Sequence, residues 1–167
     1  MKTDSTFTRR SVLGAGVAGL AAAAGLAQAQ QGPIRIGSTL ALTGPLAATA
    51  QVHKLVGEIY VEQANKRGGW LGRQLEWVLK DDQSKPDLAR TLYEQLVTAD
   101  KVDLLMGPYA TGAILSAMGV AQRYDKVLVH HTLGVPSLSK YERAFPAWSL
   151  GSEPATTVPN TLFDALA

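Results

Sequence analysis

From residue 34 onward, short apolar segments alternate with longer segments in which apolar residues recur at helical spacing. Four short aliphatic segments predict buried strands, at 34–40, 74–79, 102–106 and 127–129. Three longer segments predict helices, at 47–67, 86–99 and 111–124. Such alternation predicts an α/β fold, with a doubly wound, mostly parallel sheet that carries helices on both faces.

The longest predicted helix has one apolar face, made of Val52, Leu55, Val56, Ile59 and Tyr60. Gly68 and Gly69 follow it, as a left-handed C-terminal cap requires. After the fourth strand, residues 131–146 are expected to be irregular, with a short extended segment at 147–149. A last helix is expected to begin near Ala155.

Residues 1–29 have the features of an export signal. Arg9 and Arg10 precede an apolar run of about 16 residues, which is shorter than the roughly 20 needed to span a bilayer. Ala27 and Ala29 are small residues at the two positions that a signal peptidase reads. The segment resembles a twin-arginine signal. We expect cleavage after Ala29, a periplasmic protein and no stable membrane insertion; retention as an anchor is the alternative.

The signal also accounts for the net charge of +2, because it carries Lys2, Arg9 and Arg10 against Asp4. The rest of the chain is neutral and gives no reason to expect a nucleic acid as partner. The chain has no cysteine, which excludes disulfides and thiolate chemistry.

Candidate chemistry lies in the loops that follow the predicted strands, because ligands of such sheets bind at the carboxyl ends of strands, near the point where strand order reverses. The loop 107–112 leads directly into a helix, and Thr111 suits the N-cap position. The free N–H groups and dipole of that helix would hold a carboxylate without a cationic side chain. Alternatively, Thr111 only caps its own helix.

Other polar residues offer weaker signals. Asp81 and Asp82 suit either paired-carboxylate chemistry or hydrogen bonding at a turn, and we favour the turn. His130 and His131 are adjacent on a strand and should face opposite ways, so they are poor partners for one metal, and His53 is expected to be solvated. We find no nucleophile turn, P-loop or H-E-x-x-H motif. We therefore expect a binding protein without a cofactor or metal, rather than an enzyme.

Five short motifs follow one another along the chain: Ala41-Leu42-Thr43-Gly44-Pro45, Asn65-Lys66-Arg67-Gly68-Gly69, Gly72-Arg73, Asp81-Asp82-Gln83-Ser84-Lys85-Pro86 and Met106-Gly107-Pro108. In this order they resemble the landmarks of type I periplasmic binding proteins, most closely the leucine/isoleucine/valine-binding family. The resemblance runs from about Ile34 to Ala167. It implies two α/β lobes that clamp a ligand between them, so that residues 30–167 would be an incomplete N-terminal lobe and the chain a fragment.

The resemblance also implies a function and a site. The function is the extracytoplasmic solute-binding component of an ABC transporter, which captures an amino acid, an amide or another small carboxylate and delivers it to the membrane permease. A receptor's sensory domain with the same fold is the alternative, and an α/β enzyme is a more distant one. The expected ligand-binding residues are Thr43, Gly44, Pro45, Tyr109, Ala110, Thr111, Gly112, His131, Thr132, Leu133 and Gly134.

Within that set, the resemblance places Thr111 at the hydroxyl position that binds the ligand's carboxylate. Further contacts are implied from the loop after the fourth strand, at Thr132, Leu133 or Gly134. Tyr109 and His131 depart from the small residues usual in these loops, and this puts a leucine-like ligand in doubt.

Overall fold

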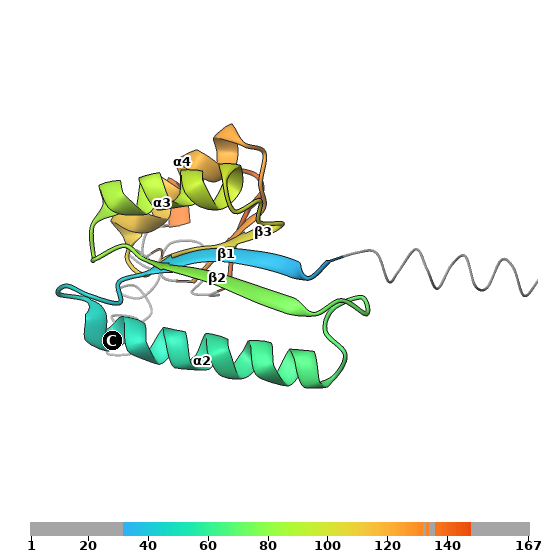
Figure 1. The fold of residues 1–167 in the computed structure, drawn as a ribbon. Coiled ribbons are helices and arrows are strands. Elements are labelled where there is room, and N and C mark those ends of the chain that lie inside the picture. The colour runs from blue at the N-terminus through green and yellow to red at the C-terminus, as the bar shows by residue number, and fades with distance from the viewer. Residues whose placement is uncertain (1–31, 132, 134–135, 148–167) are drawn as a thin grey trace, which may run out of the picture.

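Five parallel strands form one sheet in the order β2-β1-β3-β4-β5 (Figure 1). The computed structural model describes residues 32–131, 133 and 136–147. The strands are β1 (Ile34–Leu40), β2 (Leu75–Asp81), β3 (Leu104–Met106), β4 (Leu128–His130) and β5 (Ala144–Pro146). The predicted parallel sheet is confirmed.

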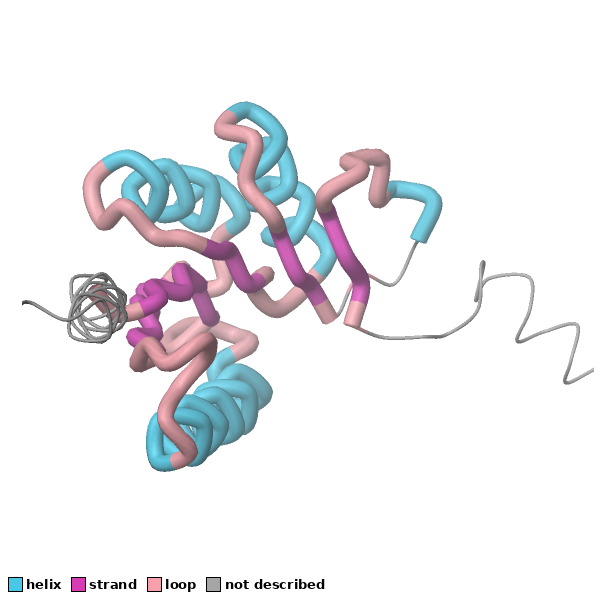
Figure 2. The backbone as a smooth tube through the Cα atoms, turned by 90° about the vertical axis from the view of Figure 1, so that its right-hand side faces the viewer, coloured by secondary structure: helices cyan, strands magenta, loops and turns pink. Residues whose placement is uncertain are grey.

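Helices cover both faces of this sheet, as the alternating pattern predicts. One face carries α2 (Ala47–Lys66), and the other carries α3 (Pro86–Thr98) and α4 (Thr111–Arg123) (Figure 2). A short 3-10 helix, η1 (Pro136–Leu138), joins β4 to β5. The strand order reverses between β1 and β3, because the chain moves outward from β1 to β2 and then crosses back to β3.

The main core lies between the sheet and the pair α3 and α4. Its buried side chains come from both helices, from the strands beneath them and from the loop between α3 and β3, and include Tyr93, Leu96, Val102, Leu105, Ile114, Val120 and Leu128. Burying one aliphatic side chain of this size stabilises a fold by about 1.5–3 kcal/mol. This half of the lobe is therefore well packed by residues that the structure describes.

The face of α2 that the sequence marks as apolar is not buried in the described part of the chain. Val52 and Val56 are 61% and 60% exposed, whereas the buried residues of α2 are Ala50 and Ala64. The helix approaches β2 through Gly57, where an added Cβ would lie 2.6 Å from the ring of Trp77. The periodicity of α2 thus predicted the helix but not its packing.

The second difference is the last strand. β5 (Ala144–Pro146) lies within the stretch 131–146 that was expected to be irregular, and of the extended segment expected at 147–149 only residue 147 is described. Pro146 reads as a break in the sequence, but β5 is at the edge of the described sheet, where a missing N–H is tolerated. The expected signal at 1–29 and the expected helix near Ala155 lie outside the described residues.

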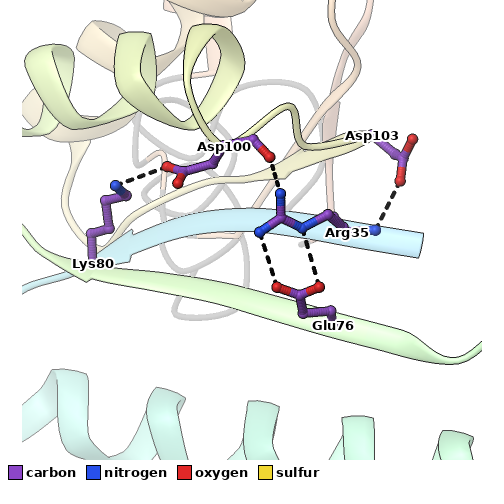
Figure 3. A network of polar contacts seen from close by, with 5 residues as sticks. All are labelled: Arg35, Glu76, Lys80, Asp100 and Asp103. Atoms are coloured by element: carbon purple, nitrogen blue, oxygen red, sulfur yellow. Dashed lines mark hydrogen bonds and ion pairs between the residues drawn. The ribbon is translucent and has the colours of Figure 1, made fainter. Parts of the chain in front are cut away.

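Charged side chains join the strands and the loop after α3. Arg35 donates from Nε and Nη2 to the carboxylate of Glu76, at 3.1 and 3.0 Å (Figure 3). Lys80 pairs with Asp100 at 2.8 Å, and the backbone N–H of Arg35 donates to Asp103 at the same distance. Exposed ion pairs contribute only about 0–1 kcal/mol each, so this network fixes register more than it adds stability. None of the described helices is both long and apolar enough to cross a membrane.

Candidate functional site

The carboxyl ends of the parallel strands lie at one edge of the sheet, and the strand order reverses between β1 and β3, which is the position where sheets of this kind bind ligands. From β1 the chain passes to α2 on one face, and from β3 it passes to α4 on the other. The loops after β1 and β3 therefore diverge, which leaves the end of α4 facing the space between them. The sequence analysis predicts the ligand at this position.

The N-terminus of α4 lies at this edge, and helix N-termini have the N–H donors that anions bind. The N-cap is Ala110 rather than Thr111, and it makes no side-chain cap hydrogen bond, so the prediction that Thr111 caps the helix is wrong. Thr111 is instead the first helical residue. Its N–H and those of the next two residues have no partner within the helix. No acidic residue lies in the first turn to neutralise the dipole.

Ala110 holds a strained backbone at this position. Its φ is +78° with ψ of 141°, a region that favours glycine. Such strain costs about 1–3 kcal/mol and persists only where the surroundings enforce it. Gly112 follows, and a Cβ there would lie 3.2 Å from the ring of Pro86 at the start of α3. Close packing against α3 therefore fixes the direction of the first turn of α4.

The loop after β1 is held by the end of β2. The N–H and hydroxyl of Thr43 donate to the carboxylate of Asp81 at 3.2 and 2.7 Å. Burial raises the pKa of Asp81, but the hydrogen bonds from Thr43 and from nearby N–H groups outweigh it, and the net pKa is lowered. Gly44 has φ of +86° and packs against the carbonyl of Gln83, which a Cβ would approach to 2.7 Å. Both donors of Thr43 are thus engaged within the protein, while Gly44 and Pro45 are exposed.

A buried carboxylate lies beneath this loop. Asp82 is 1% exposed and accepts hydrogen bonds from the hydroxyl of Thr39 at 2.7 Å and the N–H of Ser84 at 3.0 Å. Burial is the main cause that raises its pKa. Ser84 in turn donates to the carbonyl of Thr43 and accepts from the N–H of Leu46. Asp81 and Asp82 therefore act as hydrogen-bond acceptors at turns, as predicted.

Three aromatic side chains lie together at the same edge, one from α2, one from the loop after β3 and one from the loop after β4. The ring of His53, on α2, lies 5.3 Å from that of Tyr109 and 4.6 Å from that of His131. The sequence led us to expect a solvated His53, and in the structure this residue is half-buried, because α2 runs over the sheet and brings it to these loops. Burial, followed by the nearby His53 and His130, lowers the pKa of His131 to about 4. The imidazole of His131 is therefore uncharged at neutral pH.

His130 and His131 face different surroundings, as their adjacency predicts. His130 is 2% exposed beside Gly107, where an added Cβ would lie 2.7 Å from the Cβ of His130. Burial lowers its pKa, and neither ring nitrogen has a hydrogen-bond partner among the described residues. Within the described ranges, no group of three His, Cys, Asp or Glu side chains is placed to hold a metal.

The remaining predicted residues lie in the loop after β4. Leu133 is half-buried and packs against the main core, so its side chain contributes to stability. Thr132 and Gly134 lie outside the described residues. The structure thus brings Tyr109 and His131 together through His53, places Ala110, Thr111 and Gly112 at the start of α4, and engages Thr43 with Asp81.

Comparison with known proteins identifies the fold. Residues 33–167 match the family described as periplasmic binding protein. A Leu/Ile/Val-binding protein, BraC3, of Rhizobium johnstonii is 30% identical over 107 residues, which cover 64% of this chain and 29% of that protein. A chemotactic signal transduction system substrate-binding protein, BasB, of Halobacterium salinarum is 33% identical over 114 residues, covering 67% of this chain and 28% of that protein.

The solved structures agree. The branched-chain amino acid transporter substrate-binding protein LivJ of Streptococcus pneumoniae, in complex with isoleucine, superposes with a TM-score of 0.65 at 30% identity, over 68% of this chain and 33% of that one. The chain spans about a third of the length of these relatives. The order of its strands, the similarity to these solved structures and the family match over residues 33–167 lead to one conclusion: the chain belongs to the type I periplasmic binding proteins, in the leucine/isoleucine/valine-binding family.

Proposed function

We propose that this chain forms the N-terminal lobe of an exported solute-binding protein that captures a small carboxylate, amino acid or amide between two lobes. An ABC transporter permease then receives the ligand. Residues 1–29 would direct export by the twin-arginine route and be cleaved after Ala29, which leaves the binding protein in the periplasm. Binding without chemical transformation is the whole of its role.

The observation that carries this proposal is the start of α4. Its first-turn N–H groups are aimed by a strained Ala110, and no acidic side chain lies among them. Helix N-termini of this kind bind anions through N–H donors and the helix dipole. In this arrangement Thr111 adds a hydroxyl donor, and a ligand carboxylate needs no cationic side chain from this lobe.

The three aromatic rings indicate which kinds of ligand would fit beside the anion site. His53, Tyr109 and His131 offer flat, half-buried surfaces and polar ring atoms beside the anion site. An aliphatic amino acid would use only the apolar part of this wall. Ligands that carry an amide or an aromatic ring beside the carboxylate would use both parts.

A sensory role is the second candidate, since the Halobacterium relative is named as part of a chemotactic signal transduction system. The same lobe would then close on the same ligand, but the closed form would engage a transducer in place of a permease. Growth distinguishes the two, because deletion of a transport component abolishes uptake of the ligand. Deletion of a sensory component abolishes only the tactic response.

The direct test is a titration of the complete two-lobed protein against L-isoleucine, acetamide and benzoate by calorimetry. We expect saturable binding of at least one ligand at a stoichiometry of one, with the ligand recovered unchanged. Ligand at 100 times its dissociation constant should raise the unfolding free energy by about 2.7 kcal/mol. Conversion of the ligand into a product would contradict the binding role.

A further inference from the structure

The rings of His53, Tyr109 and His131, which we call the ring cluster, are carried by different kinds of backbone. His53 lies in the second turn of α2, whereas Tyr109 and His131 lie in the loops after β3 and β4. A side chain on a helix is held in place more precisely than a side chain on a loop. His53 is therefore the member of the ring cluster whose position the fold fixes best.

The start of α2 is anchored to the strands beside it. Ala50 is 0% exposed and packs with Leu40 at the end of β1. The N–H of Leu46 donates to the hydroxyl of Ser84, in the loop after β2, at 3.1 Å. The backbone that carries His53 is thus joined to the ends of two neighbouring strands.

The ring of His53 is also fixed in its rotation. Its Nδ1 lies 2.9 Å from the carbonyl oxygen of Thr49, one turn earlier in α2. A carbonyl oxygen only accepts, so the neutral ring carries its proton on Nδ1 and donates it to Thr49. In this orientation the ring lies 4.6 Å from that of His131, at an interplanar angle of 86°, and 5.3 Å from that of Tyr109. These are separations at which aromatic rings attract one another.

We propose that His53 is a positioning residue that sets ligand selectivity by holding the rings of Tyr109 and His131 in place. The inference rests on the proposed binding of a carboxylate at the start of α4. Tyr109 comes two residues before Thr111, so the ring cluster forms a wall next to that position. Where the wall stands then decides which groups fit beside the bound carboxylate.

The space behind the ring cluster explains why the wall needs a support. An apolar cavity of about 400 Å³ lies between α2 and the sheet, and its lining includes His53, His131 and Met106. Without the ring of His53, the loop side chains can turn into that space. Ligands with a planar group then lose most, because they stack on the flat faces of the rings, whereas an aliphatic side chain makes similar contacts with a displaced wall.

Calorimetric titration of the complete two-lobed protein with benzoate and L-isoleucine tests the proposal, with the weaker ligand measured by competition against the stronger. His53→Ala should raise the dissociation constant for benzoate at least about threefold more than that for L-isoleucine, which is the size of one aromatic pair interaction. His53→Phe restores a ring and should bring the ratio of the two constants back to within about twofold of that of the unmodified protein. The matched control is Gln51→Ala, which is exposed on the same turn of α2 and should leave the ratio unchanged.

The outcomes separate this inference from the one on which it rests. If the unmodified protein binds neither ligand, both are overturned. If it binds L-isoleucine but not benzoate, the role of the ring cluster as a wall for planar groups is overturned alone. An equal loss of affinity for the two ligands in His53→Ala, or no loss for either, would also contradict the role of His53, because a general loosening of the lobe does not change the ratio.

Discussion

Asp82 is buried and joins the end of β1 to the loop after β2, and its replacement gives the sharpest stability prediction. The carboxylate is 1% exposed and receives one bond from the hydroxyl of Thr39 and one from the N–H of Ser84. Asp82→Ala removes both bonds. It leaves the Thr39 hydroxyl, which is 0% exposed, without its acceptor.

The magnitude follows from those contacts. Bonds to a charged group contribute about 1.5–3 kcal/mol each, and a buried donor without a partner costs a further 1–3 kcal/mol. Burial of the charge offsets part of this, since burial raises the pKa of Asp82 and thereby favours its neutral form. We expect Asp82→Ala to lower the unfolding free energy by about 2–4 kcal/mol. Asp82→Asn keeps the shape and an acceptor for Ser84, and should cost about 1 kcal/mol or less.

Urea unfolding followed by tryptophan fluorescence measures both variants. The control is Glu58→Ala on α2, whose carboxylate is 53% exposed and pairs at the surface with Lys54. That change should cost less than about 1 kcal/mol. Equal losses for Asp82→Ala and Glu58→Ala would refute the view that a buried carboxylate holds these loops. A loss for Asp82→Asn as large as that for Asp82→Ala would show instead that the charge itself is required.

Three further predictions concern the same edge of the sheet. Ala110→Gly should raise Tm, with a gain of about 1 kcal/mol from relief of the positive φ, and a lower Tm would contradict the strain. Gly107→Ala should cost about 1–3 kcal/mol because its Cβ would lie 2.7 Å from that of His130, whereas Gly119→Ala, with open space around it, should be neutral or stabilising. The pKa of His131 is lowered from 6.5 to about 4, so the unfolded chain binds more protons than the folded one between these pH values. The free energy of unfolding should therefore fall as the pH drops from about 6.5 to 4. H131N should flatten that slope in thermal melts recorded across this pH range.

The sequence predicted those elements whose signals are local. The strand at 34–40 and the helix that begins at Pro86 match the structure closely, because aliphatic runs and a proline at N1 act within a few residues. The order of strands and helices then sufficed for the parallel sheet. The resemblance to the binding-protein family rested on the same local motifs, and comparison with known proteins confirms it.

What the sequence missed depends on contacts between distant segments. His53 looked solvated because nothing near it in the chain indicates that α2 returns to Tyr109 and His131. The sequence suggested Thr111 as the cap because an alanine gives no indication that it will adopt the positive φ that Ala110 has here. The exposure of the apolar face of α2 likewise depends on which other segment covers it, and periodicity carries no information on that.

The central claim is that the start of α4 binds the ligand's carboxylate, and one variant tests it most directly. Thr111→Val keeps the volume of the side chain and removes the hydroxyl donor, and since Thr111 is not the cap of α4, Tm should stay nearly constant. A bond to a charged group is worth about 1.5–3 kcal/mol, which is roughly a 10- to 150-fold change in affinity. The measurement is calorimetric titration of the two-lobed protein and its Thr111→Val variant with the tightest ligand among L-isoleucine, acetamide and benzoate. For a carboxylate ligand, we predict at least a tenfold rise in Kd at unchanged Tm; a Kd within a factor of two of the unmodified protein would contradict the claim.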